Sequence, residues 1–268
     1  MERVLRVVLD GPRDPWLNMA IDEAIARLRS SSGVDTLRLY MWLPSGVSIG
    51  RRQDARSSVV LEEIERLGFK LVRRPTGGAA LLHPETHEIT YSIAISRDNP
   101  IYSLDVVSSS ARIAEGIAIA LRRLGAEAGV RGSGEPWRAS FCYINPGSSD
   151  VIVMGKKISG SAQRRDWGSL LQHGTLLLRY DHDLFIRVIR IEEPQASEKV
   201  MGLWEFIDAG IRDIMDAMVE GFREALGYRG VIYGSLKAEE ISLAMDLYRY
   251  KYSTPEWNLE GRAAEEWR

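Results

Sequence analysis

The sequence predicts an α+β fold in which helices flank a mixed, largely antiparallel central sheet. Segments with strand-like alternation cluster in the middle of the chain, and segments with helical spacing lie between and around them. The helices do not alternate one for one with the strands, as a doubly wound parallel sheet would require. The chain has 268 residues, of which 45% are hydrophobic, and this is enough for one well-packed domain.

The individual elements follow from local spacing and from turn-forming residues. Asp14 is a candidate N-cap with Pro15 in the first helical position, and apolar residues recur after it at helical spacing. Helices are expected at about 15–30, 58–67, 103–124, 182–190, 210–226 and 238–250. Strands are expected at about 36–42, 46–50, 69–74, 79–83, 88–95, 150–163 and 169–180. The strands at 79–83 and 88–95 are expected to pair with each other, and 150–163 is expected to turn tightly at Gly155.

Composition and charge exclude several classes of protein. Lys and Arg total 35 against 37 for Asp and Glu, and this net charge of -2 gives no general attraction to nucleic acid. No apolar run reaches the ~18 residues of a membrane span, and the N-terminus does not resemble a signal peptide, so we expect a cytoplasmic protein. One cysteine and four scattered histidines offer no internal disulfide and no zinc-ligand spacing, so no metal site is expected.

The single cysteine and two adjacent lysines lie within one segment, "FCYINPGSSDVIVMGKK" at 141–157. Cys142 is either a small core residue or a nucleophile, because free cysteine is among the most buried residue types. A thiol is only about 3% ionised at pH 7, and a nearby ammonium raises that fraction and can protonate a departing thiol. Lys156 and Lys157 point to opposite faces of a strand, so they have different environments and one of them can face a cavity.

A glycine-containing turn and two histidines are further candidates. The segment "RRPTGG" at 73–78 places arginines before small residues, where backbone amides can approach an anion. An ordinary tight turn with a solvated arginine is the alternative. His83 and His173 lie next to apolar residues, and this favours hydrogen-bonded wall residues over catalysts. Glycines near both histidines would let a ligand come close.

Seven segments, taken in order, carry a resemblance to a known family. They read "NMAIDEAI", "LRLYMWLPSGVSIGRRQ", "LVRRPTGGAALLH", "EITYSI", "SFCYINPGSSDVIVMGKKISGSAQRR", "LLQHGTLLL" and "KYSTPEWN". Over almost its whole length the chain resembles the lipoate-protein ligases and octanoyltransferases. This resemblance implies a catalytic domain like those of biotin-protein ligases and class II synthetases, with an acyl tunnel. The glycine-rich segment at 227–237 then marks a division between a catalytic domain over 1–236 and a C-terminal helix and tail over 237–268 that pack on it.

The resemblance implies one of two chemistries, and both attach an acyl group to a lysine of a lipoyl domain. Ligases use ATP and Mg²⁺ to form a lipoyl adenylate, and this chain would then need a separate accessory domain. Transferases use no cofactor and take octanoate from octanoyl-acyl carrier protein through a cysteine thioester. The segment "CYINPGSSD" resembles the transferases rather than the "GRND" of the ligases. We therefore expect octanoyl transfer, with an acceptor such as glycine cleavage H protein or a 2-oxoacid dehydrogenase subunit.

The resemblance also assigns roles to individual residues. Cys142 would be the nucleophile, and Lys157 its electrostatic partner and proton donor or acceptor. The substrate-binding positions would be Arg74, Thr76, Gly77, Gly78, His83, Gly160, Ala162 and His173. In these roles the arginine and glycine turn holds the acyl carboxyl region or the pantetheine of the carrier, small residues line the tunnel, and the histidines give support. A third alternative, an inactive scaffold that binds lipoyl domains, is disfavoured because the cysteine, lysine and histidines are all retained.

Overall fold

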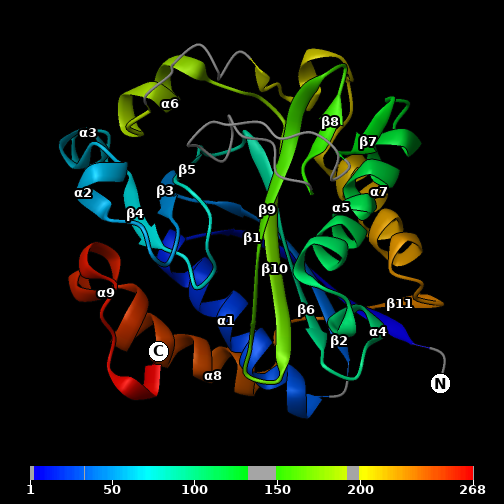
Figure 1. Cartoon of the computed structure of the whole chain (residues 1–268), viewed down its shortest axis with the longest axis horizontal. Coiled ribbons are helices and arrows are strands. Elements are labelled where there is room, and N and C mark those ends of the chain that lie inside the picture. The colour runs from blue at the N-terminus through cyan, green and yellow to red at the C-terminus, as the bar shows by residue number, and fades with distance from the viewer. Residues whose placement is uncertain (1–2, 33, 132–148, 192–198, 268) are drawn as a thin grey trace.

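The computed structural model describes residues 3–32, 34–131, 149–191 and 199–267 of the chain. Figure 1 shows a large sheet in the middle of the molecule, with helices on both of its faces. The predicted α+β class, with a mixed sheet that helices flank, is confirmed. Cys142 lies outside the described residues, so its place in the site stays a prediction.

The main sheet has eight strands among the described residues and is largely antiparallel, as the sequence predicts. In sheet order the strands are β11 (Gly230–Tyr233), β1 (Val4–Arg13), β2 (Asp35–Trp42), β6 (Glu88–Ser96), β10 (Ser169–Leu177), β9 (Lys156–Asp166), β8 (Val151–Val153) and β7 (Ala128–Val130). Strand β1 pairs in parallel with β11 and β2, and each later neighbour in the sheet is antiparallel. Every residue of β2, β6 and β10 is buried, because these strands are central in the sheet and helices cover its faces.

The sequence pattern does not predict β1, β7 or β11, and there is a physical reason why each of these strands is missed. Strands β7 and β11 have only three and four residues, too few for a periodic signal. Strand β1 carries Arg6 inside its apolar alternation. In the structure this arginine is buried, with Nη2 2.5 Å from Glu240 Oε1 and Nε 3.1 Å from Thr36 Oγ1. A partner more than two hundred residues away cannot be recognised from local sequence.

A second, three-stranded sheet corrects one prediction. It consists of β4 (Lys70–Arg73), β3 (Gly46–Ile49) and β5 (Leu81–His83), with β3 in the centre. The predicted pairing of 79–83 with 88–95 is therefore wrong, because β5 pairs with β3 while β6 pairs with β2 and β10. The chain changes sheets at His87, whose carbonyl accepts hydrogen bonds from the backbone of Leu178 and Arg179 just after β10. These bonds direct β6 into the main sheet instead of back along β5.

Two layers of helices cover the main sheet (Figure 1). The α-helices of the described residues are α1 (Pro15–Ser32), α2 (Ala55–Ser58), α3 (Leu61–Arg66), α4 (Pro100–Ser103), α5 (Val106–Arg123), α6 (His182–Val188), α7 (Ile211–Ala225), α8 (Ala238–Leu247) and α9 (Pro255–Glu260), of which α2, α3 and α6 share a core with β3 of the small sheet. Helices α5 and α7 pack on each other and share one hydrophobic core with the strands. Helices α1 and α8 pack together over the opposite face and share a second core with Tyr40 and Trp42 of β2.

The predicted helices are present, but two of them are interrupted. The segment predicted as a helix at 58–67 contains the last residue of α2 and all of α3, with Val59 and Val60 extended between them. The segment predicted at 103–124 consists of the end of α4 and all of α5. Helix α5 begins where the Asp105 side chain accepts a hydrogen bond from the backbone of Ser108 at 2.9 Å. This N-cap fixes the start of the helix one turn later than apolar spacing suggests.

The C-terminal segment is fixed to the rest of the chain by buried polar contacts. Lys251 is buried beside Glu23 of α1, with Nζ 2.9 and 2.8 Å from the two carboxylate oxygens. Arg73, at the end of β4, donates to the carbonyls of Trp257 at 2.7 Å and Asn258 at 3.1 Å. Trp257 Nε1 in turn donates to the Arg73 carbonyl at 2.9 Å. The tail thus covers the edge of the small sheet, and the division into 1–236 and 237–268 stays a prediction.

Candidate active site

A pocket, called the central pocket below, lies on the face of the main sheet that α1 covers. Its floor runs across four strands, because Tyr40 of β2, Thr90 of β6, Thr175 of β10 and Gly160 of β9 stand opposite one another in the sheet register. Three strand spacings of ~4.8 Å make this row about 14 Å long. The other lining residues are Met19, Trp42, Arg74, Gly78, Leu81, His83, Ser149, Asp150, Lys157, Ser161, Ala162, His173 and Gly174.

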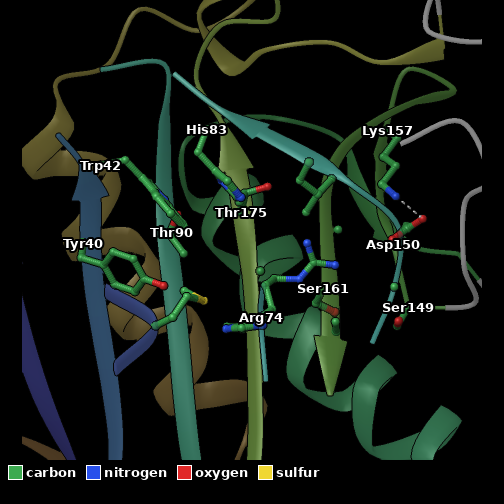
Figure 2. Close-up of a pocket in the computed structure, with 17 residues that line it drawn as sticks. Tyr40, Trp42, Arg74, His83, Thr90, Ser149, Asp150, Lys157, Ser161 and Thr175 are labelled. Carbon is green, nitrogen blue, oxygen red and sulfur yellow. Dashed lines mark hydrogen bonds and ion pairs between the residues drawn. The ribbon is translucent and has the colours of Figure 1, made fainter. Parts of the chain in front are cut away.

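Figure 2 shows that the two ends of the central pocket differ. Tyr40 and Trp42 lie at one end, and Lys157 and Asp150 lie at the other, with Arg74 between them. Tyr40 and Trp42 belong to the buried core under α1, so this end is closed. The floor between the ends carries small side chains, which leave space for an elongated ligand.

Lys157 is the buried cation at the second end of the pocket. It belongs to β9, which follows β8 through a two-residue turn in which Met154 and Gly155 have φ of 51° and 75°. This confirms the tight turn predicted at Gly155. Lys157 is only 3% exposed, and its Nζ lies 2.7 Å from Asp150 Oδ2, whereas Lys156 is exposed. The prediction that the two lysines have different environments is confirmed.

Gly160 makes room for the Lys157 side chain. A Cβ atom at position 160 would lie 2.9 Å from both Cε and Nζ of Lys157, closer than real Cβ contacts allow. The ammonium group therefore lies along the wall of the pocket beside Gly160. A side chain at this position would push Lys157 away from Asp150, whose Oδ1 would lie 3.4 Å from the same Cβ.

A chain of hydrogen bonds, called the His83 chain, connects Glu88 to Arg74. Glu88 Oε1 lies 2.7 Å from His83 Nδ1, and His83 Nε2 lies 2.7 Å from Ser48 Oγ. Arg74 Nη1 donates to the same Ser48 oxygen at 2.7 Å. The imidazole of His83 also stacks on Trp42, with the ring centroids 4.0 Å apart and the planes 9° from parallel. Both nitrogens of the His83 imidazole and one of its faces are therefore fixed within the protein.

A second chain, called the His173 chain, connects Asp22 to Thr76. His173 Nδ1 lies 3.4 Å from Asp22 Oδ2, and His173 Nε2 lies 2.6 Å from Thr76 Oγ1. Burial lowers the pKa of His173 below its usual range, and the imidazole is neutral. Burial alone would raise the pKa of Asp22, but the hydrogen bond from His173 and the charge of Arg38 hold it below its usual range. Nδ1 then donates to the Asp22 carboxylate, and Nε2 accepts from the Thr76 hydroxyl.

Both chains end on the turn formed by Thr76, Gly77 and Gly78, called the glycine turn. Arg74 Nη2 donates to the carbonyls of Gly77 and Ala79, each at 2.9 Å. Thr76 is held through its hydroxyl by His173. The turn is therefore held in one position against the pocket, and this kind of fixed backbone is suited to placing a substrate.

The structure brings most of the predicted site residues together. Arg74, Gly78, His83, Gly160, Ala162, His173 and Lys157 line the central pocket, and Thr76 and Gly77 lie directly beside it. The sequence analysis assigns no role to Asp22, Ser48, Glu88 or Asp150, which hold those residues in place. Asp22 offers one recognisable signal, because it is an acidic residue on the apolar face of a predicted helix. The catalytic and binding roles remain predictions.

Comparisons with known proteins identify the family. Residues 14–226 match the sequence model of the lipoyl protein ligase A/B catalytic domain. This chain belongs to that family. A member named octanoyltransferase LipM from Kyrpidia tusciae is 36% identical over 94% of this chain and 97% of its own length. Octanoyltransferase LipM of Bacillus subtilis is 32% identical over 95% of this chain and 98% of its own length.

Solved structures of lipoate protein ligases share the fold. A lipoate-protein ligase A bound with ATP is 30% identical, with a TM-score of 0.84 over 98% of this chain and 100% of that chain. A Thermoplasma acidophilum protein with bound lipoic acid is 29% identical, with a TM-score of 0.81 over 97% of this chain and 100% of that chain. The family members named in these comparisons thus include both transferases and ligases.

Within residues 3–32, 34–131, 149–191 and 199–267, no three His, Cys, Asp or Glu side chains are grouped so that they could hold a metal ion. In the same part of the chain, no helix has the length and apolar character needed to cross a membrane.

Proposed function

We propose that this protein is an octanoyltransferase that acylates the acceptor lysine of lipoyl domains. The observation that carries the proposal is the central pocket, which has a closed apolar end and the buried Lys157 at the other end. Its floor is about 14 Å long, from three strand spacings, and this suits a medium-length acyl chain lying across the strands. The full-length similarity to proteins named octanoyltransferase favours transfer over ligation.

In the first step the Cys142 thiolate attacks the carbonyl carbon of octanoyl-acyl carrier protein. A carbon–sulfur bond to Cys142 forms, the bond to the pantetheine sulfur breaks, and the departing thiolate takes a proton from the Lys157 ammonium. The short sequence distance from Cys142 to β8 and β9 supports this pairing. Asp150 is a positioning residue, because its carboxylate holds the ammonium at the wall of the pocket.

In the second step the ε-amine of the acceptor lysine attacks the octanoyl-Cys142 thioester. The amide bond forms, the thioester bond breaks, and Cys142 is released as a thiolate. The neutral Lys157 amine left by the first step accepts the proton that the attacking amine loses, so the two steps return the enzyme to its starting state. Acyl carrier protein and a lipoyl domain are thus the expected partners, and the reaction balances with no cofactor.

The His83 and His173 chains support this reaction without making or breaking bonds. They hold Arg74, Thr76 and the glycine turn, whose backbone faces the acyl group in this proposal. A neutral His173 suits this role, because its two nitrogens are engaged by Asp22 and Thr76. The protein is expected to act in the cytoplasm, where its partners would be found.

An ATP-dependent lipoate-protein ligase is the second candidate. It is favoured by the solved ligase structures at 29% and 30% identity, one with bound lipoic acid and one with ATP. In that reaction Lys157 would bind the acyl carboxyl and phosphate oxygens, Mg²⁺ would accompany ATP, and Cys142 would take no part.

A single assay separates the two candidates. Purified protein is incubated with an unacylated lipoyl domain and either octanoyl-acyl carrier protein without ATP, or octanoate with ATP and Mg²⁺. The transferase proposal predicts acylation of the lipoyl domain only in the first mixture, and loss of that activity in Cys142→Ala. Acylation that requires ATP and persists in Cys142→Ala would overturn it.

A further inference from the structure

A second groove, called the arginine groove, lies against the glycine turn. Arg51, Arg52 and Arg164 line it together with Gln163 and the exposed backbone of Gly77 and Gly78. Gly78 lines both this groove and the central pocket, so the two are adjacent. We propose that the arginine groove binds the phosphate group of the phosphopantetheine arm that carries the octanoyl donor. The inference rests on the proposed function, because it concerns the same donor.

The charges in the groove are not balanced within the described part of the chain. Arg164 forms an ion pair with Asp166. Among the described residues, the guanidinium groups of Arg51 and Arg52 have no carboxylate within ion-pair distance. Arg51 is half-buried, and burial together with the charge of Arg164 lowers its pKa. Like charges held together at a partly buried site favour an anionic ligand, and the planar guanidinium matches the oxygens of a phosphate.

The loop that carries Arg51 and Arg52 is fixed from inside the protein. Buried Arg73 donates from Nη1 to the carbonyls of Gly50 at 3.2 Å, Arg51 at 3.1 Å and Gln53 at 2.6 Å. These carbonyl oxygens therefore point toward Arg73. The backbone N–H of Arg51 donates to the Thr76 carbonyl at 2.8 Å, which ties the loop to the glycine turn. The arginines are thus presented by a rigid support, as a binding site requires.

The distance between the two sites suits the pantetheine arm. The Lys157 ammonium lies beside Gly160. Arg164 is four residues after Gly160 on the same strand, β9. Four residues of strand span about 13 Å, and residues separated by an even number point to the same face of the sheet. An extended pantetheine chain can therefore have its thioester near Lys157 and its phosphate near Arg164 and Arg51.

The test compares three donors that differ only beyond the pantetheine chain: octanoyl-pantetheine, octanoyl-4′-phosphopantetheine and octanoyl-acyl carrier protein. The second-order rate of protein octanoylation is measured by intact mass for the wild type and for the double variant Arg51→Gln/Arg52→Gln. We expect the wild type to prefer the phosphorylated donor over octanoyl-pantetheine by about tenfold or more, since one charge-assisted contact is worth that much. In the double variant this ratio should fall to near one.

A matched control and a direct binding measurement complete the design. Arg56→Gln removes one exposed charge from the adjacent helix α2, outside the groove, and should keep the wild-type ratio. Calorimetric titration with unacylated 4′-phosphopantetheine should show binding to the wild type and at least tenfold weaker binding to the double variant. If the wild type binds 4′-phosphopantetheine more tightly than the double variant but is not octanoylated by any donor, the phosphate site is supported and the proposed function is overturned. Equal ratios in wild type and double variant, or a loss seen only with octanoyl-acyl carrier protein, would overturn the phosphate site.

Discussion

The two histidine chains and the Lys157–Asp150 pair both resemble catalytic arrangements, but their surroundings differ. Glu88, His83 and Ser48 follow the acid–histidine–hydroxyl order that hydrolases use to activate a nucleophile, and so do Asp22, His173 and Thr76. In both chains the terminal hydroxyl is buried, and the hydroxyl of Ser48 also accepts a hydrogen bond from Arg74. Lys157 instead lies at the pocket end that Ser149 and Asp150 line, and these two residues follow Cys142 closely in the sequence. The acid–histidine–hydroxyl order alone therefore does not identify a nucleophile. A nucleophile must also lie where it can reach a substrate in the pocket.

The largest effect is expected from removing the Lys157 ammonium. Lys157→Met should lower the rate of octanoyl transfer by about a hundredfold or more, the usual contribution of a positioned acid or base. The neighbouring variant Lys156→Met should change the rate less than threefold, because that side chain is exposed. Single-turnover transfer from octanoyl-acyl carrier protein to a lipoyl domain measures both. Equal losses in the two variants would contradict the role given to Lys157.

Breaking the His173 chain at its carboxylate should mainly affect stability. In Asp22→Asn the buried Arg38 guanidinium loses the carboxylate that lies 2.8 Å from its Nη1. Arg38 keeps a second carboxylate partner, Asp10 at 2.9 Å, so the loss of unfolding free energy should be about 2 kcal/mol rather than that of a charge left unpaired. Ser92→Ala removes only one hydrogen bond to the same carboxylate and should cost about 1 kcal/mol. Urea unfolding measures both variants, and an equal loss in the two would contradict this ranking.

The free energy of unfolding should depend on pH through the His173 chain. Burial lowers the folded-state pKa of His173 below 6.5, so below that pH the unfolded chain binds a proton that the folded chain does not. The free energy of unfolding should therefore fall as the pH drops below about 6.5, by at most about 1.4 kcal/mol per pH unit from this group. The lowered pKa of Asp22 acts in the same direction nearer pH 3.8.

The matched variant for this pH dependence is His173→Gln. His87, whose pKa burial also lowers, is present in both proteins and contributes equally to each. Urea unfolding between about pH 5 and pH 8 should show a smaller slope in the variant than in the wild type. Identical slopes would show that His173 is not held neutral in the folded protein.

A smaller effect on activity than that of Lys157→Met is expected from the centre of the His83 chain. Ser48→Ala removes the hydroxyl that links Arg74 to His83, at 2.7 Å from each. The unfolding free energy should fall by about 1 to 3 kcal/mol because buried polar groups lose a partner. The KM for the acyl donor should rise more than kcat falls, since the glycine turn is loosened while Lys157 is untouched. A fall in kcat alone would indicate that Ser48 takes part in the chemistry.

The sequence predicts the fold class, most elements and seven of the seventeen residues that line the central pocket, because these depend on local spacing and on family motifs. It does not predict which sheet β5 joins, since three residues carry too little pattern to specify a partner. The sequence also does not reveal that the carboxylates of Asp22, Glu88 and Asp150 hold the site residues in place. Asp22 contacts His173 across 151 residues of sequence, and such a pairing exists only after the strands have assembled.

The central claim is that Cys142 carries the octanoyl group, and intact mass spectrometry tests it most directly. The protein is mixed with octanoyl-acyl carrier protein in the absence of ATP and of any lipoyl domain. The account predicts a single octanoyl adduct that hydroxylamine removes and that Cys142→Ser does not form. An enzyme that octanoylates lipoyl domains while carrying no such adduct, or that keeps the adduct in Cys142→Ser, would contradict the account.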